Sequence, residues 1–189
     1  MNFKPIYWYY GNTKFSSEEI DEFKSNLDKL DVEKLTGTFI VGEKLIKNND
    51  CISTFVYCEN DRPDVKYNDM YSKIVENITK NVGIYNNILY DYTYWTQMYD
   101  NNMCHKPHNH AKLDPNFVDI ISWVHFIDVP EQKCFRFLDN DGNFFIPDEQ
   151  KNGDIICFPS WAWHEVIPNE TEYRRLVISG NISVTHFDS

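Results

Sequence analysis

The amino-acid sequence predicts a mainly β domain, a sandwich or barrel with helices packed against one face. Three observations carry this prediction: apolar residues at helical spacing in the first half, an apolar period of two from about position 84, and turn residues between the later apolar runs. The 189 residues suit one domain, with a helical support over 1–83 and a β core over 84–185.

Two helices are expected in the first half. Ser16 and Glu19 have the spacing of a capping box, so a helix should begin after Ser16. Its apolar face would be formed by Ile20, Phe23, Leu27 and Leu30. A second helix is expected over 67–82, and residues 52–57 between the two helices have the composition of a strand.

The second half has the pattern of a β core. A long half-buried strand is expected from Ile88 to Gln97, where aromatic residues recur at every second position. Further strands are expected over 119–128, 134–138, 143–146, 155–158, 163–167 and 175–184. Asp139–Gly142 and Asn152–Asp154 provide turn residues between them.

The composition disfavours some classes of partner. With 18 basic and 29 acidic residues the net charge is −11, which disfavours nonspecific binding to nucleic acid or to an anionic membrane. The N-terminal segment lacks the apolar stretch expected of a signal peptide, and no segment approaches the length of a membrane span. The five cysteines are scattered and odd in number, so we expect a reducing, cytoplasmic location rather than a disulfide framework.

Histidines are concentrated in one part of the chain, and five of the six lie between positions 105 and 164. His108 and His110 are two residues apart, and on a strand such residues point to the same side. His164 follows an apolar strand, where a buried polar group usually has a partner. If the three imidazoles meet, they would bind one face of a metal such as Fe(II) and leave the other open; zinc, or a polar loop pair without metal, are alternatives.

Arg174 and Arg175 stand at the beginning of the last expected strand. A guanidinium in this position can hold a carboxylate through two parallel hydrogen bonds. The alternative for each arginine is a solvated strand end.

Over 93–183 the sequence resembles a known enzyme family. The segments that carry the resemblance are Trp95–Tyr99, Pro107–His110, Ile121–Phe126, Gly153–Ser160 with His164, Val166–Asn169 and Arg175–Asn181. They are similar to the Fe(II)- and 2-oxoglutarate-dependent oxygenases, in particular to a small prolyl-hydroxylase-like set found in marine phages and bacteria. The resemblance implies a double-stranded β-helix, of the jelly-roll or cupin-like type, with N-terminal support helices.

The resemblance also implies the roles of individual residues. His108, His110 and His164 would hold Fe(II), and Arg175 would bind the distal carboxylate of 2-oxoglutarate. Arg174 is the alternative, because a register shift of one residue exchanges the side chains that face inward.

The sequence departs from the family pattern at two positions. His110 stands where the family usually has a carboxylate; Asp114 or Asp119 would supply that carboxylate if His110 lies beside the metal rather than on it. The family often has Ser or Thr two residues after the arginine, where this chain has Val177. Ser179 or a tyrosine would then provide the hydroxyl.

Other residues near the motif have two interpretations each. His125 is either a satisfied core group or, facing inward with Trp123, a contact to keto acid or substrate. Trp163 is either a wall of the substrate pocket or part of an apolar turn. His105 is expected in a loop, outside the site.

The preferred interpretation is a 2-oxoglutarate-dependent dioxygenase that uses O2 to hydroxylate a peptide residue or a small molecule. One alternative is a cupin-like metalloenzyme that uses no keto acid, of the three-histidine thiol dioxygenase or isomerase type. The other is a β-helix binding module without catalytic activity.

Overall fold

The computed structural model describes residues 3–29, 38–41, 44–47, 51–56, 64–82, 90–111 and 117–185. The helical elements are α1 Ser17–Asp28, η1 Thr54–Val56, η3 Val65–Tyr67 and α3 Asn68–Asn81. The strands are β1 Trp8–Asn12, β2 Thr38–Val41, β3 Lys44–Lys47, β4 Ile52–Ser53, β5 Tyr90–Tyr99, β6 His105–His108, β7 Phe117–Asp128, β8 Phe135–Leu138, β9 Phe144–Phe145, β10 Asp154–Pro159, β11 His164–Val166 and β12 Arg175–Thr185.

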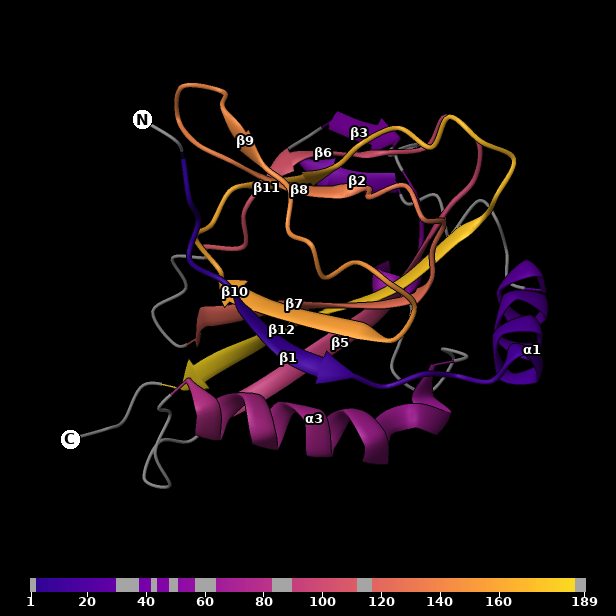
Figure 1. The fold of residues 1–189 in the computed structure, drawn as a ribbon, viewed down its shortest axis with the longest axis horizontal. Helices are drawn as coiled ribbons and strands as arrows, with labels where there is room; N and C mark the ends of the chain where they lie inside the picture. Colours follow the sequence, from indigo (N-terminus) through magenta and orange to yellow (C-terminus); the bar gives the residue numbers. More distant parts are fainter. Residues whose placement is uncertain are drawn as a thin grey trace.

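Two antiparallel sheets face each other and form a jelly-roll sandwich (Figure 1). The larger sheet has the order β1-β10-β7-β12-β5-β4, and the smaller has the order β6-β11-β8-β9. Helix α3 lies across the outer face of the larger sheet, on the side away from the smaller one (Figure 1). The expected β sandwich with helices on one face is therefore confirmed.

Helix α1 begins where the capping box predicts. The Ser16 side chain accepts a hydrogen bond from the Glu19 backbone N–H (3.2 Å), and the Glu19 carboxylate accepts one from the Ser16 N–H (2.7 Å). Its inner face buries Phe23 and Leu27. Lys24 also forms an ion pair with Asp128 at the end of β7, which ties the helix to the larger sheet.

Helix α3 closes the core on the outer side of the larger sheet. It buries one face, made of Tyr71, Ile74, Val75, Ile78 and Thr79. The Tyr71 ring stacks on the Trp123 indole, with centroids 5.3 Å apart. Gly180 allows this packing, because a Cβ at that position would lie 2.4 Å from Cζ2 of Trp123.

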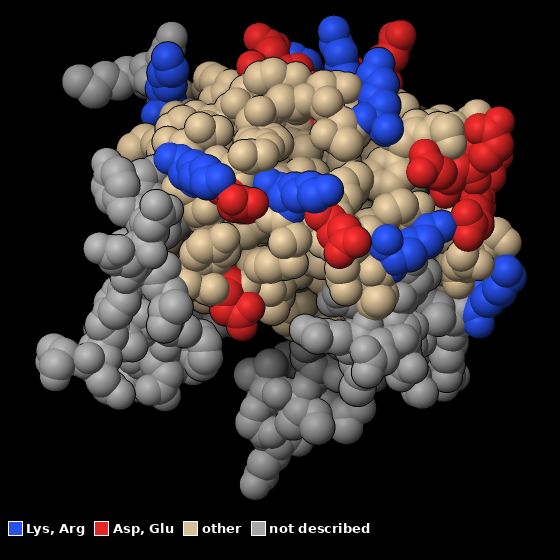
Figure 2. All heavy atoms as spheres, turned by 90° about the horizontal axis from the view of Figure 1, so that it is seen from below, with Lys and Arg blue, Asp and Glu red and all other residues tan. Residues whose placement is uncertain are grey.

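The remaining surface on this side is mixed in charge. Seen from below, the basic and acidic side chains of the described residues are interspersed (Figure 2). Lys80 pairs with Glu76 one helical turn away (2.6 Å), and Lys66 pairs with Glu22 (2.9 Å). No helix within the described ranges has both the length and the apolarity needed to cross a membrane.

A second core fills the space between the two sheets. Its centre is aromatic, because Phe126, Phe135, Phe137 and Phe158 are each no more than 2% exposed. The larger sheet is thus covered on both faces, by helices outside and by the smaller sheet inside. The space between the sheets contains the candidate site.

The structure corrects some expected elements. Residues 52–57 do not form one strand: β4 ends at Ser53, Thr54–Val56 form a 3-10 turn, and Tyr57 lies outside the described residues. Strand β1 was not expected; it pairs with β10 at the edge of the larger sheet. His105 begins β6 rather than lying in a loop. The positions Leu30, Ile88 and Leu89 lie outside the described residues.

His125 is a satisfied core group on the helix side of the larger sheet. Its Nε2 lies 2.7 Å from the Thr13 carbonyl oxygen, which can only accept, so Nε2 carries the proton. Nδ1 then accepts a hydrogen bond from the Tyr71 hydroxyl (3.0 Å). Burial lowers the pKa of His125 to about 4, so the ring is neutral near neutral pH.

Because His125 is buried in its neutral form, the free energy of unfolding should decrease as the pH is lowered. The folded pKa lies below the unfolded value of about 6.5, so the contribution is complete above pH 6.5 and is lost as the pH falls towards 4. The loss should reach about 3 kcal/mol, and His125→Gln should flatten the profile in this window. Denaturant unfolding at several pH values measures the free energy of unfolding of wild type and of His125→Gln. If this free energy changes with pH equally in the two proteins, His125 is not the group responsible.

Candidate metal and anion site

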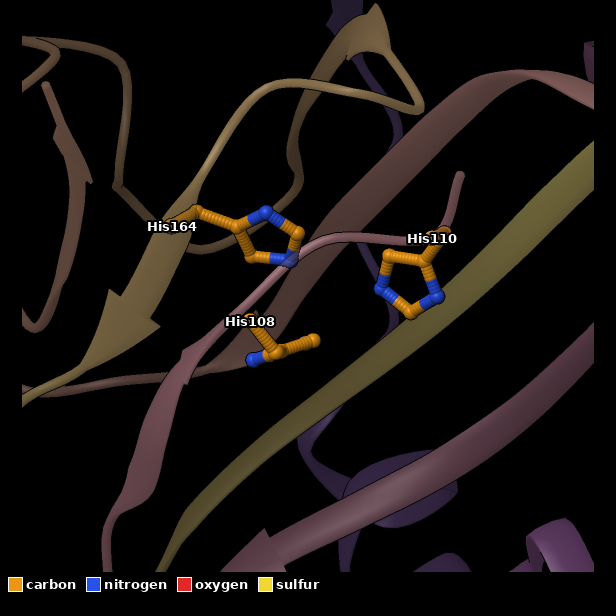
Figure 3. A group of neighbouring side chains, drawn as sticks. All are labelled: His108, His110 and His164. Atoms are coloured by element: carbon orange, nitrogen blue, oxygen red, sulfur yellow. The ribbon is translucent and has the colours of Figure 1, made fainter. Parts of the chain in front are cut away.

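Three histidines meet at one edge of the smaller sheet. Strands β6 and β11 are antiparallel neighbours, and their register places His108 directly opposite His164. His110 lies two residues beyond the end of β6, and its backbone N–H donates to the Ser160 carbonyl (2.8 Å) in the turn before β11. One ring nitrogen from each histidine lies within 4.8 Å of the others (Figure 3). The structure therefore brings together the three residues predicted as metal ligands.

Two of these histidines are held in the tautomer that binds metal through Nε2. The Nδ1 of His108 faces the Lys106 carbonyl (2.7 Å), and the Nδ1 of His164 faces the Ala162 carbonyl (2.8 Å). A carbonyl only accepts, so the proton lies on Nδ1 and Nε2 is left bare. Burial lowers the pKa of His108, and it lowers that of His164 well below its ordinary value, with His108 and His110 acting in the same direction. The imidazoles are thus neutral, as metal ligands must be.

The cavity beside the histidines extends between the two sheets. Its polar lining residues are His105, His108, His110, His164, Gln97, Ser122 and Ser179. The described lining residues include no Asp or Glu. A cation in this cavity therefore gains no negative charge from the described part of its lining.

Hydrogen bonds connect three of the residues that line the cavity, Ser179, Gln97 and His105. The Ser179 hydroxyl donates to Oε1 of Gln97 (2.7 Å), and Nε2 of Gln97 lies 3.1 Å from Nδ1 of His105. The His105 ring stacks on His108, with centroids 4.1 Å apart. Burial lowers the pKa of His105 to about 3, so this fourth imidazole is also neutral.

Arg175 is a buried cation without a carboxylate. It is 0% exposed, and the structure shows no ion pair for it among the described residues. Its guanidinium donates to two carbonyls, Ile167 (3.0 Å) and Pro168 (3.4 Å), while Nε has no hydrogen-bond partner. A buried charge in this condition is expensive, and an anion would compensate it.

Tyr99 lies directly across the sheet from Arg175. The two residues form a register pair of β12 and β5, which places their side chains side by side on the inner face. The buried Tyr99 hydroxyl also has no hydrogen-bond partner. Burial raises the pKa of Tyr99 well above its ordinary value, so the phenol stays protonated and can donate. Arg175 Nε and Tyr99 Oη are thus both unsatisfied donors on neighbouring strands, and Tyr99 lines the cavity.

Arg174 faces the opposite way. Its Nε and Nη2 donate to the two oxygens of the Asp100 carboxylate (2.6 and 3.3 Å), and its Nη1 donates to Asp28 (2.6 Å). Neighbouring residues of a strand point to opposite faces, so only one of the two arginines can reach the inside. The register of β12 assigns that place to Arg175.

The other predicted residues are placed outside the site or at its border. His125 lies on the helix side of the larger sheet, with both ring nitrogens engaged. Trp123 borders the cavity, but its indole is 0% exposed and stacks on α3. Trp163 is 45% exposed and is not among the residues that line the cavity. Asp114 and the side chain of Asp119 lie outside the described part of the chain.

Sequence reasoning missed several residues that the structure places here. They are Tyr99, Gln97, His105, Asn181 and Ser122. The period of two in β5 places Gln97 and Tyr99 on one face, but it does not show which strands lie beside that face. Of these residues, only His105 could have been suspected from the sequence, because it lies three residues before His108.

Comparison with known proteins identifies the fold. No protein-family model matches the chain, and no curated protein sequence does. A non-heme alpha-ketoglutarate-dependent carbocyclase, SnoK from nogalamycin biosynthesis, superposes with a TM-score of 0.60 at 12% identity, over 95% of this chain and 79% of its own.

Two further solved structures agree with it. A prolyl hydroxylase from Trichoplax adhaerens, in complex with a hypoxia inducible factor peptide fragment, gives 0.60 at 13% identity over 95% and 83% of the two chains. A 2OG-Fe(II) oxygenase family oxidoreductase from Burkholderia pseudomallei gives 0.54 at 13% over 89% and 79%. The chain therefore has the double-stranded β-helix fold of the 2-oxoglutarate-dependent oxygenases, as the sequence predicted.

Proposed function

We propose that this protein is an Fe(II)- and 2-oxoglutarate-dependent dioxygenase that uses O2 to hydroxylate a peptide residue or a small molecule. We place it with the small prolyl-hydroxylase-like set that its sequence resembles. The observation that carries the proposal is the buried register pair of Arg175 and Tyr99, two unsatisfied donors, of which Tyr99 lines the cavity that also contains the three clustered imidazoles.

Arg175 and Tyr99 fit the distal carboxylate of a keto dicarboxylate. A carboxylate beside Arg175 Nε and Tyr99 Oη would satisfy both donors and neutralise the buried guanidinium. Tyr99 can also replace the hydroxyl that this chain lacks at Val177. Its neutral phenol can donate the hydrogen bond that Ser or Thr gives elsewhere in the family.

His108, His110 and His164 fit Fe(II). All three offer a ring nitrogen within 4.8 Å of the others, and the Nδ1 partners of His108 and His164 leave Nε2 bare. Bound iron and keto acid together supply the activation of O2 that oxidises an unactivated C–H bond. The protein holds these groups by its imidazoles and by Arg175, and the aromatic side chains between the sheets exclude water from them.

Among the described residues that line the cavity, none is a carboxylate that would offset a bound cation. Fe(II) on three neutral imidazoles keeps its full charge, and Arg175 adds another. A dianionic ligand such as 2-oxoglutarate would offset two of these three positive charges, so we expect the metal and the keto acid to strengthen each other's binding.

A second candidate is favoured by the same three imidazoles. A cupin-like metalloenzyme that uses no keto acid, of the thiol dioxygenase or isomerase type, would also suit a site of three histidines without a carboxylate. It would bind metal but would not need Arg175. A binding module without catalytic activity would bind no metal at this site.

Anaerobic titration separates these functions. Addition of 2-oxoglutarate to the Fe(II)-loaded protein should produce a weak visible charge-transfer band, and Arg175→Met should weaken 2-oxoglutarate binding about 100-fold through the loss of charge-assisted hydrogen bonds. Arg174→Met is the matched control, because that guanidinium points outward to Asp28 and Asp100. Its 2-oxoglutarate affinity should stay within about twofold of wild type. Metal binding without the band would favour the second function.

The phenol of Tyr99 should contribute separately. Tyr99→Phe removes one donor and keeps the ring, so 2-oxoglutarate affinity should fall about tenfold while metal affinity without keto acid is unchanged. Isothermal titration with Co(II), then with 2-oxoglutarate, measures the two steps. An unchanged keto-acid affinity would place the distal carboxylate elsewhere.

A further inference from the structure

His110 is held differently from the other two histidines of the cluster. His108 and His164 each direct Nδ1 at a backbone carbonyl, which can only accept a hydrogen bond. The Nδ1 of His110 instead lies 3.4 Å from Nδ2 of Asn181, a side chain amide on β12. An amide has one end that donates and one end that accepts, so this partner does not by itself fix the proton of His110.

Asn181 is in turn held by Ser122 on the neighbouring strand. The two residues are a register pair of β12 and β7, and both are buried, at 5% and 2% exposure. The Ser122 hydroxyl donates to Oδ1 of Asn181 (2.9 Å). A hydroxyl can also accept, so Ser122 can partner either end of the amide after a half-turn of the Asn181 side chain.

The orientation of the amide favours one of the two ring nitrogens of His110 as the carrier of the proton. With the amide nitrogen towards His110, as the structure shows, Nδ1 accepts and the proton lies on Nε2. Nε2 is on the ring edge that faces His108 and His164 (Figure 3), so this tautomer cannot bind a metal there. With the amide oxygen towards His110, Nδ1 keeps the proton and Nε2 is free to coordinate.

We propose that Asn181 is a positioning residue for His110 and that its amide orientation controls whether His110 joins the metal site. Metal binding then requires a half-turn of the amide and a shift of one proton from Nε2 to Nδ1 of the same ring. The number of protons on the protein does not change in this step. The proposal rests on the metal site of the proposed function and deepens it, because it concerns the position at which the family usually has a carboxylate.

Substitutions at Asn181 test this, with Co(II) alone as the probe. Asn181→Leu has nearly the same shape but no amide, so Co(II) affinity should fall about 10- to 100-fold. Asn181→Asp presents only acceptors, so it should fix the proton on Nδ1 and bind Co(II) at least as tightly as wild type. Ser183→Ala, two residues further along β12, is the control and should stay within about twofold. Calorimetry and the visible Co(II) spectrum report binding, and circular dichroism reports folding.

A double-mutant cycle shows whether the effect passes through His110. In a His110→Ala background, Asn181→Leu should cause no further loss of Co(II) affinity, because the ring that Asn181 positions is gone. In the metal-free protein, NMR of the histidine ring nitrogens should find the His110 proton on Nε2 in wild type and on Nδ1 in Asn181→Asp.

The outcomes are distinguishable. The proposal is overturned if Asn181→Leu and Asn181→Asp both bind Co(II) within about twofold of wild type, or if Asn181→Asp is weakened in the same way as Asn181→Leu. It is also overturned if the loss persists in the His110→Ala background. If Asn181→Leu does not fold, the proposal is still tested by Asn181→Asp and by the double-mutant cycle of Asn181→Asp with His110→Ala. A wild-type protein that binds no Co(II) overturns the metal site itself.

Discussion

A buried guanidinium without a carboxylate is the constraint on which the site depends. Arg175 is the first residue of β12, where it pairs with Tyr99 of β5, and its side chain is fully buried. Two backbone carbonyls satisfy part of the guanidinium and leave Nε unpaired. The protein therefore carries an unfavourable charge at the position where an anionic ligand would relieve it.

The charge of the cavity around the histidines differs from that of the whole chain. The net charge of the chain is −11, yet the described lining of the cavity includes no acidic residue. Burial keeps His105, His108 and His164 neutral, so they can bind or surround a metal without adding charge. Under the proposed function, this acidic protein would bind a cation at the histidines and an anion at Arg175. The anion would reduce the repulsion between the two positive groups.

The fold could be predicted from the sequence where a single element contains its own signal. The capping box of Ser16 and Glu19 fixes the start of α1 through local hydrogen bonds. The period of two in the second half predicts the strands, since one residue in two faces a core. Strand β1 carries no such signal, because it lies at the sheet edge with Trp8 and Tyr9 about half exposed.

The three clustered histidines of the candidate site could be predicted from the sequence, but most of the residues around them could not. His108, His110 and His164 followed from spacing and resemblance, although His110 lies beyond the strand on which it was expected. His125 and Trp123 could not be placed, because both faces of β7 are buried and the pattern does not show which face meets the histidines. Tyr99, Asn181 and Ser122 depend on register between strands distant in sequence, which no local pattern shows.

The central claim is that Arg175 serves the distal carboxylate of a keto dicarboxylate. The most direct measurement compares the affinity of the Co(II)-loaded protein for 2-oxoglutarate and for 2-oxopentanoate, which has the same chain with a methyl group in place of that carboxylate. The account predicts that wild type prefers 2-oxoglutarate about 100-fold and that Arg175→Met binds the two ligands equally. Equal binding by wild type, or a preference that survives in Arg175→Met, would contradict it.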